Sequence, residues 1–241
     1  MEQKKQDTKN ISFIIFDLDG VLVDTISSWV YLHEHYGVNN DTAFYAYMNN
    51  EIDDTEFMRK DIELLLNIKK KLHIKEIQRI LDTVPLMPGL KHTMKCLDYL
   101  GISTAIISAG LEQLASRIAK ICGIPHVFAN GLEIDENGYL TGEGILRVSL
   151  KNKGEVVEGL ISEMDLDPSS IVSVGNGEID IQMFNVTGLG IAFNPHDQKV
   201  IDQADLVIHK KDLTEILRYV CDIEQLPINL KDQCFCSKHL G

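Results

Sequence analysis

Two aspartates directly follow the first apolar stretch of the chain. Asp17 and Asp19 come after residues 11–16, and Gly20 follows them. Side chains two residues apart on an extended backbone point the same way, so both carboxylates can face one opening. Two close carboxylates repel each other unless a cation lies between them or one keeps a proton. A hard cation with oxygen ligands, such as Mg²⁺, fits this pair; the alternative is a helix cap with an ordinary Asp-Gly turn.

A second polar group follows another apolar run. Ser108, Ala109 and Gly110 come after residues 102–107, and a helical pattern begins directly after them. A hydroxyl and free backbone N–H groups at the start of a helix can bind an anion such as a phosphate group. A serine at this position can equally serve as an ordinary helix N-cap, so the segment alone leaves both interpretations open.

The remaining candidates lie further along the chain. Lys153 comes just before a helical pattern, and Gly154 lets the backbone approach a ligand closely. Most lysines are solvated surface charges, so this signal is modest on its own. Asn176 and Asp180 lie on a glycine-rich turn after the apolar residues 171–174 and supply an amide and a carboxylate. An ordinary glycine turn with a helix cap is the alternative interpretation of that turn.

Apolar runs that alternate with helical patterns must position these groups. Residues 11–16, 102–107, 171–174 and 189–193 are almost continuously apolar, as expected for strands buried on both faces of a parallel sheet. Shorter strands are predicted at 127–129 and 205–208, a hairpin at 133–141 that turns at Asn137-Gly138, and helices at 178–185 and 212–220. This alternation predicts an α/β fold with a doubly wound parallel sheet. Such sheets bind ligands at the carboxyl ends of their strands, where one cleft can gather the candidate groups.

The block between the first strand and the rest carries helical patterns. Within residues 25–85, Asp53 and Glu56 have the spacing of a capping box before a helical apolar stripe. We therefore expect a small helical cap, residues 25–85, inserted into a core formed by residues 11–24 and 86–220.

Composition limits the classes of partner. Asp and Glu outnumber Lys and Arg by 36 to 23 in 241 residues, which gives a formal charge of -13. This balance argues against nucleic acid and the membrane surface as partners, because both require a basic face. No apolar run is long enough to span a membrane, and residues 1–10 lack the apolar core of a signal peptide, so we expect a cytoplasmic protein. We expect a monomer or a homodimer.

The end of the chain holds a possible metal-binding group. Residues 221–241 show no periodicity and are expected to form a flexible tail. Cys234, Cys236 and His239 lie within it and could bind a soft metal, but three ligands in a flexible tail favour unpaired surface cysteines instead. The odd total of five cysteines does not resemble the disulfide framework of a secreted protein.

Taken in order, these segments resemble the motifs of the haloacid dehalogenase superfamily. The resemblance covers about residues 11–220 and rests on Phe16-Asp-Leu-Asp-Gly-Val-Leu-Val-Asp24, Ile106-Ile-Ser-Ala-Gly110, Lys153-Gly and Val174-Gly-Asn-Gly-Glu-Ile-Asp180. Two further segments, Leu140-Thr-Gly-Glu143 and Gly188-Leu-Gly-Ile-Ala-Phe193, are similar to its phosphoserine-phosphatase-like branch. The resemblance implies a Rossmann-like core with a cap.

The resemblance also implies roles for individual residues. Asp17 would attack phosphorus and become an aspartyl phosphate, and Asp19 would act as the general acid and base. Ser108, Ala109 and Lys153 would bind the phosphoryl oxygens. Mg²⁺ would be held by Asp17, Asp19, Asn176 and Asp180. The implied activity is hydrolysis of a small phosphorylated metabolite.

The chain departs from the family pattern in two places. Asn176 stands where the fourth motif usually has an aspartate, which removes one negative charge from the implied metal site. Phosphoserine phosphatases also place a Glu after the first motif and an Arg in a cap helix. Here residues 25–28 contain no Glu, and Asp61 falls where the Arg is expected, with Arg59 two residues away.

Two other functions therefore stay open. Gly20-Val21 and Asp24-Thr25 also resemble the sugar phosphomutase branch of the same superfamily. A phosphometabolite-binding protein without hydrolytic activity is the alternative from another class, and Asn176 is the reason to consider it.

Overall fold

A central sheet with helices on both faces forms the core of the molecule. The computed structural model describes residues 11–221 and 225–234. The strands are β1 (Phe13–Phe16), β2 (Ser103–Leu111), β3 (His126–Ile134), β4 (Leu140–Ile145), β5 (Ile171–Gly175), β6 (Leu189–Phe193) and β7 (Leu206–Ile208). They form a 7-stranded sheet in the order β4-β3-β2-β1-β5-β6-β7. Only the β3–β4 pair is antiparallel among the described strand pairs.

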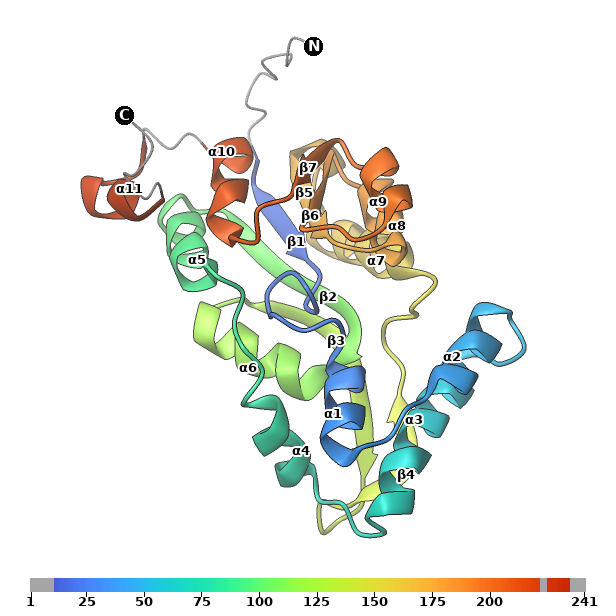
Figure 1. The fold of residues 1–241 in the computed structure, drawn as a ribbon. Coiled ribbons are helices and arrows are strands. Elements are labelled where there is room, and N and C mark those ends of the chain that lie inside the picture. The colour runs from blue at the N-terminus through green and yellow to red at the C-terminus, as the bar shows by residue number, and fades with distance from the viewer. Residues whose placement is uncertain (1–10, 222–224, 235–241) are drawn as a thin grey trace.

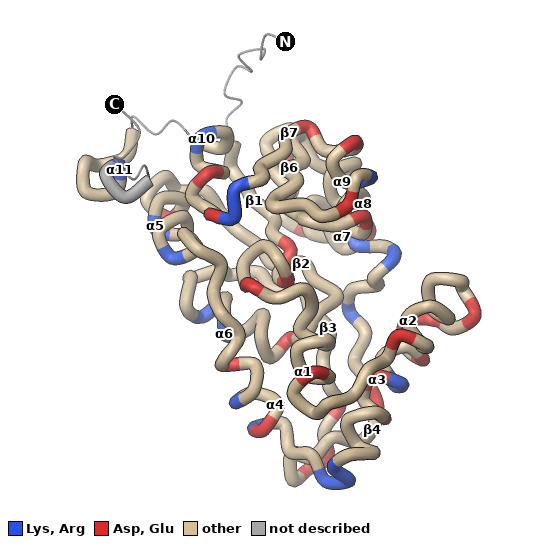
Figure 2. The backbone as a smooth tube through the Cα atoms, viewed as in Figure 1, with Lys and Arg blue, Asp and Glu red and all other residues tan. Residues whose placement is uncertain are grey.

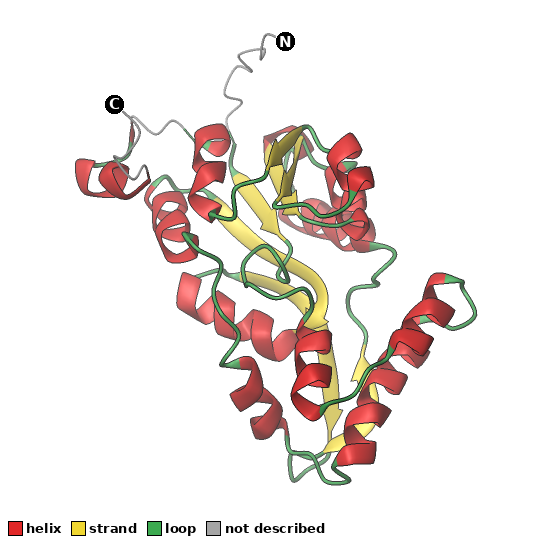
Figure 3. Cartoon of the chain, in the orientation of Figure 1, coloured by secondary structure: helices red, strands yellow, loops and turns green. Residues whose placement is uncertain are grey.

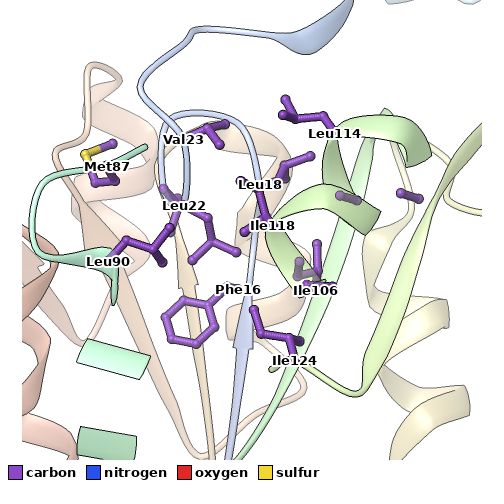
Figure 4. Packing of buried hydrophobic residues seen from close by; sticks show 14 of the residues in the cluster. Phe16, Leu18, Leu22, Val23, Met87, Leu90, Ile106, Leu114, Ile118 and Ile124 are labelled. Carbon is purple, nitrogen blue, oxygen red and sulfur yellow. The ribbon is translucent and has the colours of Figure 1, made fainter. Parts of the chain in front are cut away.

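Side chains of β1 alternate between two apolar clusters, one on each face of the sheet. Ile14 and Phe16 belong to one cluster, and Phe13 and Ile15 belong to the other. Successive side chains on a strand point to opposite faces, so β1 contributes equally to both layers. Figure 4 shows the first cluster with Phe16, Leu18, Leu22, Val23, Met87, Leu90, Ile106, Leu114, Ile118 and Ile124.

The core helices divide between these two faces. The longer ones are α5 (Leu90–Tyr99), α6 (Glu112–Cys122) and α7 (Lys153–Met164), and the shorter ones are α8 (Ile181–Phe184), α9 (Gln198–Gln203) and α10 (Leu217–Val220). Short 3₁₀ helices cover Pro168–Ser170, Glu178–Asp180 and Leu213–Ile216. Apolar residues of α5, α6 and α10 join the first cluster, and those of α7, α8 and α9 join the second. The predicted doubly wound α/β fold is confirmed (Figure 3).

The predicted helical block lies between β1 and α5. Its helices are α1 (Ser28–Tyr36), α2 (Asp41–Met48), α3 (Asp54–Ile68) and α4 (Ile74–Leu81). Asp53 caps α3, since its carboxylate accepts a hydrogen bond from Glu56 N at 2.8 Å. The Glu56 side chain pairs with Arg59 and Lys60. Leu32 and Ile62 of this block belong to the same apolar cluster as Phe16, so the block packs directly on the core.

The hairpin is longer than the sequence indicates. β3 extends to Ile134, far beyond the predicted strand at 127–129, and the β3–β4 hairpin packs against α3 (Figure 1). Arg59 Nε lies 2.9 Å from Glu143 Oε1, and Leu140 N donates to Leu72 O at 2.9 Å. The predicted turn at Gly138 is confirmed by its φ of 83° and its hydrogen bond to Asp135 O. The hairpin therefore joins the sheet to the helical block, and the boundaries of core and cap stay a prediction.

Part of the segment predicted as a flexible tail is structured. Helix α11 (Ile228–Cys234) packs against α5, and Leu226 is buried in the first apolar cluster. Leu226 and Leu230 supply apolar contacts that hold this segment, although two apolar residues are too few for a helical pattern to be recognised. Cys236 and His239 lie outside the described residues. Among the described helices, none is long and apolar enough to cross a membrane.

Candidate active site

The candidate residues gather at the carboxyl ends of three neighbouring strands. β1 lies between β2 and β5, with Phe16 in register with Ile106 on one side and Val174 on the other. Asp17 follows the last residue of β1, and Asn176 follows the last residue of β5. Because these strands are parallel and in register, the residues that follow them meet at one edge of the sheet.

The second motif occupies a different position from the predicted one. Ser108, Ala109 and Gly110 lie within the last part of β2, which runs to Leu111, whereas they were expected to follow a strand that ends at residue 107. The register of β2 with β3 shifts between Ile107 and Leu111. The segment therefore continues as an irregular strand beside the site, and α6 begins directly after it.

A buried lysine bridges two carboxylates at this edge. Lys153, at the start of α7, places Nζ 2.9 Å from Asp17 Oδ1 and 2.7 Å from Asp180 Oδ1. The other oxygen of Asp180 accepts hydrogen bonds from Asn176 N at 2.8 Å and Gly177 N at 3.1 Å. Lys153 is 1% exposed and Asp180 is 0% exposed. The ammonium group of Lys153 is therefore held between the carboxylates of Asp17 and Asp180 inside the protein.

Burial and mutual repulsion govern the charges of this group. Desolvation raises the pKa of Asp17, and the nearby Asp180 charge adds to this, while Lys153 opposes both. Burial favours a lower pKa for Lys153, but the charges of Asp17 and Asp180 outweigh it and raise the pKa. Lys153 therefore stays protonated and can balance only one of the two flanking charges.

The carboxylate of Asp19 is held separately from this group. Its Oδ2 accepts hydrogen bonds from the backbone N and the Oγ of Ser28, both at 2.9 Å. Burial, followed by repulsion from Asp17, raises the pKa of Asp19 to about 7, against the opposing effect of the Ser28 hydrogen bonds. A group with a pKa near the working pH can both give and take a proton efficiently.

Gly20 and Asn176 occupy the turn between these groups. Gly20 has a φ of 75°, which a residue with a side chain rarely adopts. A Cβ atom at Gly20 would also collide with the side-chain amide of Asn176. Gly20 thus satisfies two demands at once, the turn after Asp19 and the close approach of Asn176.

Asn130, a buried asparagine that none of the four sequence motifs includes, supports the second motif. Asn130 Nδ2 donates to Ala109 O at 3.1 Å and to Val148 O at 2.9 Å. Its Oδ1 accepts from Arg147 N at 2.8 Å and Val148 N at 2.9 Å. Asn130 follows the short apolar run of β3, and an asparagine directly after a predicted strand is the only signal that the sequence offers for it.

Positive charge is distributed among acidic residues over the described part of the molecule. Figure 2 shows Lys and Arg interspersed with Asp and Glu in the core and in the helical block. Arg59 is paired with Glu143 and Glu56. An anionic ligand at this site would therefore depend on individual groups such as Lys153 and on a bound cation.

The oxygen atoms at this edge suit Mg²⁺. Among the described residues, no group of three or more His, Cys, Asp or Glu side chains is arranged to hold a metal ion. The oxygen donors at this edge are the carboxylate of Asp17, the amide oxygen of Asn176, the backbone carbonyl of Asp19 and the carboxylate of Asp180, whose two oxygens also bind Lys153 and the backbone N–H groups of Asn176 and Gly177. Mg²⁺ is commonly bound by one or two carboxylates, with waters and substrate phosphate completing the shell. The buried negative charge that Lys153 leaves unbalanced also favours a cation.

The comparison with known families agrees with this geometry. A family model described as haloacid dehalogenase-like hydrolase matches residues 11–188. The chain belongs to the haloacid dehalogenase-like hydrolases. All the residues discussed above, from Asp17 to Asp180, lie within the matched range of this hydrolase family.

Individual relatives of this hydrolase family show similarity over most of the chain. A phosphoserine phosphatase of Methanocaldococcus jannaschii is 31% identical over 225 residues, which cover 91% of this chain and 100% of the relative. A phosphoserine phosphatase of Archaeoglobus fulgidus is 32% identical over 205 residues, which cover 83% of this chain but only 57% of that relative. A solved structure of a phospho-aspartyl intermediate analogue of phosphoserine phosphatase has a TM-score of 0.74 at 29% identity and covers 88% of this chain and 100% of its own.

The helical block contacts the segment that leads to Lys153. Asp54, the first residue of α3, accepts hydrogen bonds from Ser149 Oγ at 2.9 Å and Leu150 N at 3.0 Å. Lys151 Nζ donates to Tyr47 O at 2.5 Å and to Asn50 Oδ1 at 2.7 Å. These contacts connect the helical block to the site through residues 149–153.

Proposed function

We propose that the protein is a Mg²⁺-dependent phosphomonoester hydrolase that acts on a small phosphorylated metabolite. The observation that carries this proposal is the buried group of Asp17, Lys153 and Asp180 beside the separately held Asp19. One carboxylate at the end of β1 is available for attack, and the second is poised to exchange protons. The membership of the chain in the haloacid dehalogenase-like hydrolases supports the same reaction class.

The reaction proceeds in two steps. An oxygen of Asp17 attacks phosphorus, the bond between phosphorus and the ester oxygen breaks, and Asp19 gives its proton to the departing alcohol. The product of this step is an aspartyl phosphate on Asp17. Asp19, now ionised, takes a proton from a water molecule that attacks the same phosphorus, and Asp17 is released with inorganic phosphate.

The other residues of the site neutralise and position charge. The ammonium group of Lys153 binds a phosphoryl oxygen. The hydroxyl of Ser108 and the backbone N–H groups near Ala109 donate hydrogen bonds to the other phosphoryl oxygens. Asp17, the backbone carbonyl of Asp19, Asn176 and Asp180 would hold Mg²⁺, which supplies charge neutralisation to the phosphoryl group when bound. Phosphoryl transfer depends mainly on such positioning and neutralisation.

The relatives and the helical block bear on the end of the substrate that carries no phosphate. The relatives named above are phosphoserine phosphatases, so phosphoserine belongs in any test panel. Arg59, which could bind a substrate carboxylate, is already paired with Glu143 and Glu56, and Asp61 lies buried beside His33. We therefore propose the broader class of small phosphomonoesters.

Replacement of the nucleophile tests this function. Asp17→Asn should abolish hydrolysis of phosphomonoesters in the presence of Mg²⁺, because an amide does not form the acyl phosphate. The measurement is phosphate release from an aryl phosphate and from a panel of phosphorylated metabolites, with circular dichroism to check folding. Asp98→Asn, an exposed change on α5, is the matched control and should keep wild-type turnover.

Each alternative predicts a different result in this assay. Wild-type turnover in Asp17→Asn would contradict the assignment of the nucleophile. Conversion of a sugar phosphate to its isomer without phosphate release would identify a phosphomutase. Binding of phosphometabolites without turnover by the wild type would identify a binding protein.

A further inference from the structure

Ser28 is a fully buried serine that contacts two parts of the site at once. It is the first residue of α1 and belongs to the helical block, yet its polar atoms point into the core. Its backbone N and its Oγ both donate to Asp19 Oδ2 at 2.9 Å. The same Oγ accepts a hydrogen bond from Leu111 N at 2.9 Å. Ser28 is 0% exposed, so these bonds are shielded from water.

The surroundings of Gly110 show how closely these groups converge. A Cβ atom at Gly110 would lie 2.5 Å from Asp19 Oδ2, 2.7 Å from Ser28 Oγ and 3.2 Å from Ser108 Oγ. Three oxygen atoms from different segments therefore surround a single backbone position. Any movement of Ser28 would change the space available to Asp19 and to the segment 108–111.

The two oxygens of Asp19 are not equivalent. Oδ2 accepts two hydrogen bonds from Ser28, whereas Oδ1 is buried and accepts no hydrogen bond from the described residues. Ser28 thus fixes the rotation of the carboxyl group by holding one oxygen. The other oxygen is the one left available to exchange a proton with a substrate.

The hydroxyl of Ser28 is not required to begin the helix. Ser27 is the N-cap of α1, and its side chain accepts from Val30 N at 3.5 Å. Ser28, the next residue, therefore does not serve as the N-cap. Instead, the hydroxyl of Ser28 forms hydrogen bonds with both Asp19 and Leu111. These two residues lie in different segments of the core.

We propose that Ser28 is a positioning residue for the general acid and base. Through its hydroxyl, the start of α1 orients the carboxyl group of Asp19 and ties it to the phosphate-binding segment 108–111. This inference rests on the proposed function, because it assigns to Asp19 the proton transfer described above. It extends the site to a residue of the helical block that none of the four sequence motifs includes.

Removal of the hydroxyl should affect substrates according to their leaving groups. An alcohol of high pKa needs a proton as it departs, whereas p-nitrophenolate departs without one. In Ser28→Ala, the first-turnover release of alcohol from an alkyl phosphate, measured with enzyme in excess, should fall roughly 10- to 100-fold. The first-turnover release of p-nitrophenol from p-nitrophenyl phosphate should change by less than about threefold. Measurement of the first turnover separates this step from the later attack of water, in which Asp19 also takes part.

Two further variants separate positioning from a structural role. Ser28→Thr keeps the hydroxyl and should restore most of the alkyl phosphate rate. Ser27→Ala is the matched control, because it removes a side-chain hydroxyl from the same helix start without touching Asp19. It should lower the stability of α1 but leave the ratio of the two first-turnover rates as in the wild type.

The outcomes are distinct. The inference is overturned if Ser28→Ala lowers both rates equally or changes neither, or if Ser27→Ala shows the same selective loss. A Ser28→Thr variant that folds but does not recover the alkyl phosphate rate also counts against it. If the wild type hydrolyses neither substrate, the proposed function itself fails, which differs from an active wild type with an unchanged ratio.

Discussion

At the proposed Mg²⁺ site, the residue at position 176 sets how much negative charge the end of β5 offers to the cation. The backbone N–H of Asn176 donates to Asp180, and its side-chain amide lies against Gly20, beside the residues that we propose to hold Mg²⁺. An amide oxygen binds Mg²⁺ without a full charge, and the charge of the ligands tunes affinity for hard cations. We therefore expect Mg²⁺ to bind more weakly here than at an otherwise identical site with aspartate.

Asn176→Asp should lower the Mg²⁺ concentration that gives half-maximal activity. Each ~1.4 kcal/mol gained in binding lowers it roughly tenfold. Turnover at saturating Mg²⁺ should change little, because the new charge acts on binding of the metal. The measurement is a Mg²⁺ titration of hydrolysis, with Asn185→Asp at the exposed end of α8 as the control for added charge. An unchanged half-saturation point in Asn176→Asp would place Asn176 outside the metal shell.

The sequence motifs include the candidate site residues but not the neutral side chains of Ser28 and Asn130 that hold them in place. Asp17 and Asp180 were predictable because charged residues beside apolar strands have few structural roles. Ser28 and Asn130 were not, because a serine at a helix start and an asparagine after a strand are both common in ordinary caps and turns. Their importance depends on contacts with residues about 80 and 20 positions away, which local patterns do not reveal.

Helices α1 and α3 are joined by a buried acidic and basic pair. His33 Nε2 lies 3.4 Å from Asp61 Oδ1, and Asn40 Nδ2 donates to the same oxygen at 2.5 Å. Burial raises the pKa of Asp61 to about 7, against the opposing effect of Asn40, and burial lowers the pKa of His33. Burial therefore keeps His33 neutral at pH 7, where Asp61 is about half protonated.

This pair should make the stability of the protein depend on pH. Between its ordinary value of 3.8 and about 7, Asp61 keeps its proton when folded and loses it when unfolded. Its contribution to the free energy of unfolding is complete below pH 3.8 and is lost as the pH rises through about 7. His33 acts in the opposite direction, since its contribution is lost as the pH falls below its ordinary value.

Asp61→Asn isolates the contribution of the carboxyl group. Relative to the wild type, the variant should gain on the order of 2 kcal/mol in free energy of unfolding between pH 5 and pH 8. Urea denaturation at several pH values measures this difference. Glu63→Gln on the exposed side of α3 is the control and should show a much smaller change. A difference for Asp61→Asn that stays constant over this range would show that Asp61 titrates normally.

The apolar patterns place the strands, but they give the full length of only some of them. β6 was predicted at its observed bounds, because its apolar run ends where the strand ends. β2 and β3 continue beyond their apolar runs, through Ser108 and Asn130, because polar side chains there are satisfied by contacts within the site. A strand that enters a polar site keeps its backbone conformation while it loses the apolar pattern by which it is recognised.

At the scale of the whole molecule, the helical block and the core share one apolar cluster. Leu32, Ile62 and Leu65 belong to the same cluster as Ile14 and Phe16. An insert that buries its own apolar residues against the core is expected to unfold together with it. Deletion of residues 25–85 would therefore expose the core, so variants of single residues are better tests of this block than its removal.

The chain should unfold in a single transition. Trp29, the single tryptophan, is half-buried in α1 and reports on the helical block, while far-ultraviolet circular dichroism reports on all helices. Urea transitions measured by the two signals should coincide. Leu65→Ala should shift both by the same amount, with a loss of about 2–5 kcal/mol for a buried leucine. A tryptophan signal that changes at lower urea than the circular dichroism would show that the helical block unfolds first.

Residues 149–153 form a connection whose length cannot vary freely. Asp54 and Lys151 bind this segment to the helical block, and Lys153 binds it to Asp17 and Asp180. Connecting segments usually tolerate insertions because their ends are the only fixed points. Here one added residue would move either Lys151 away from the helical block or the ammonium group of Lys153 away from Asp17 and Asp180. An insertion at 149–153 would therefore disconnect the helical block from the site.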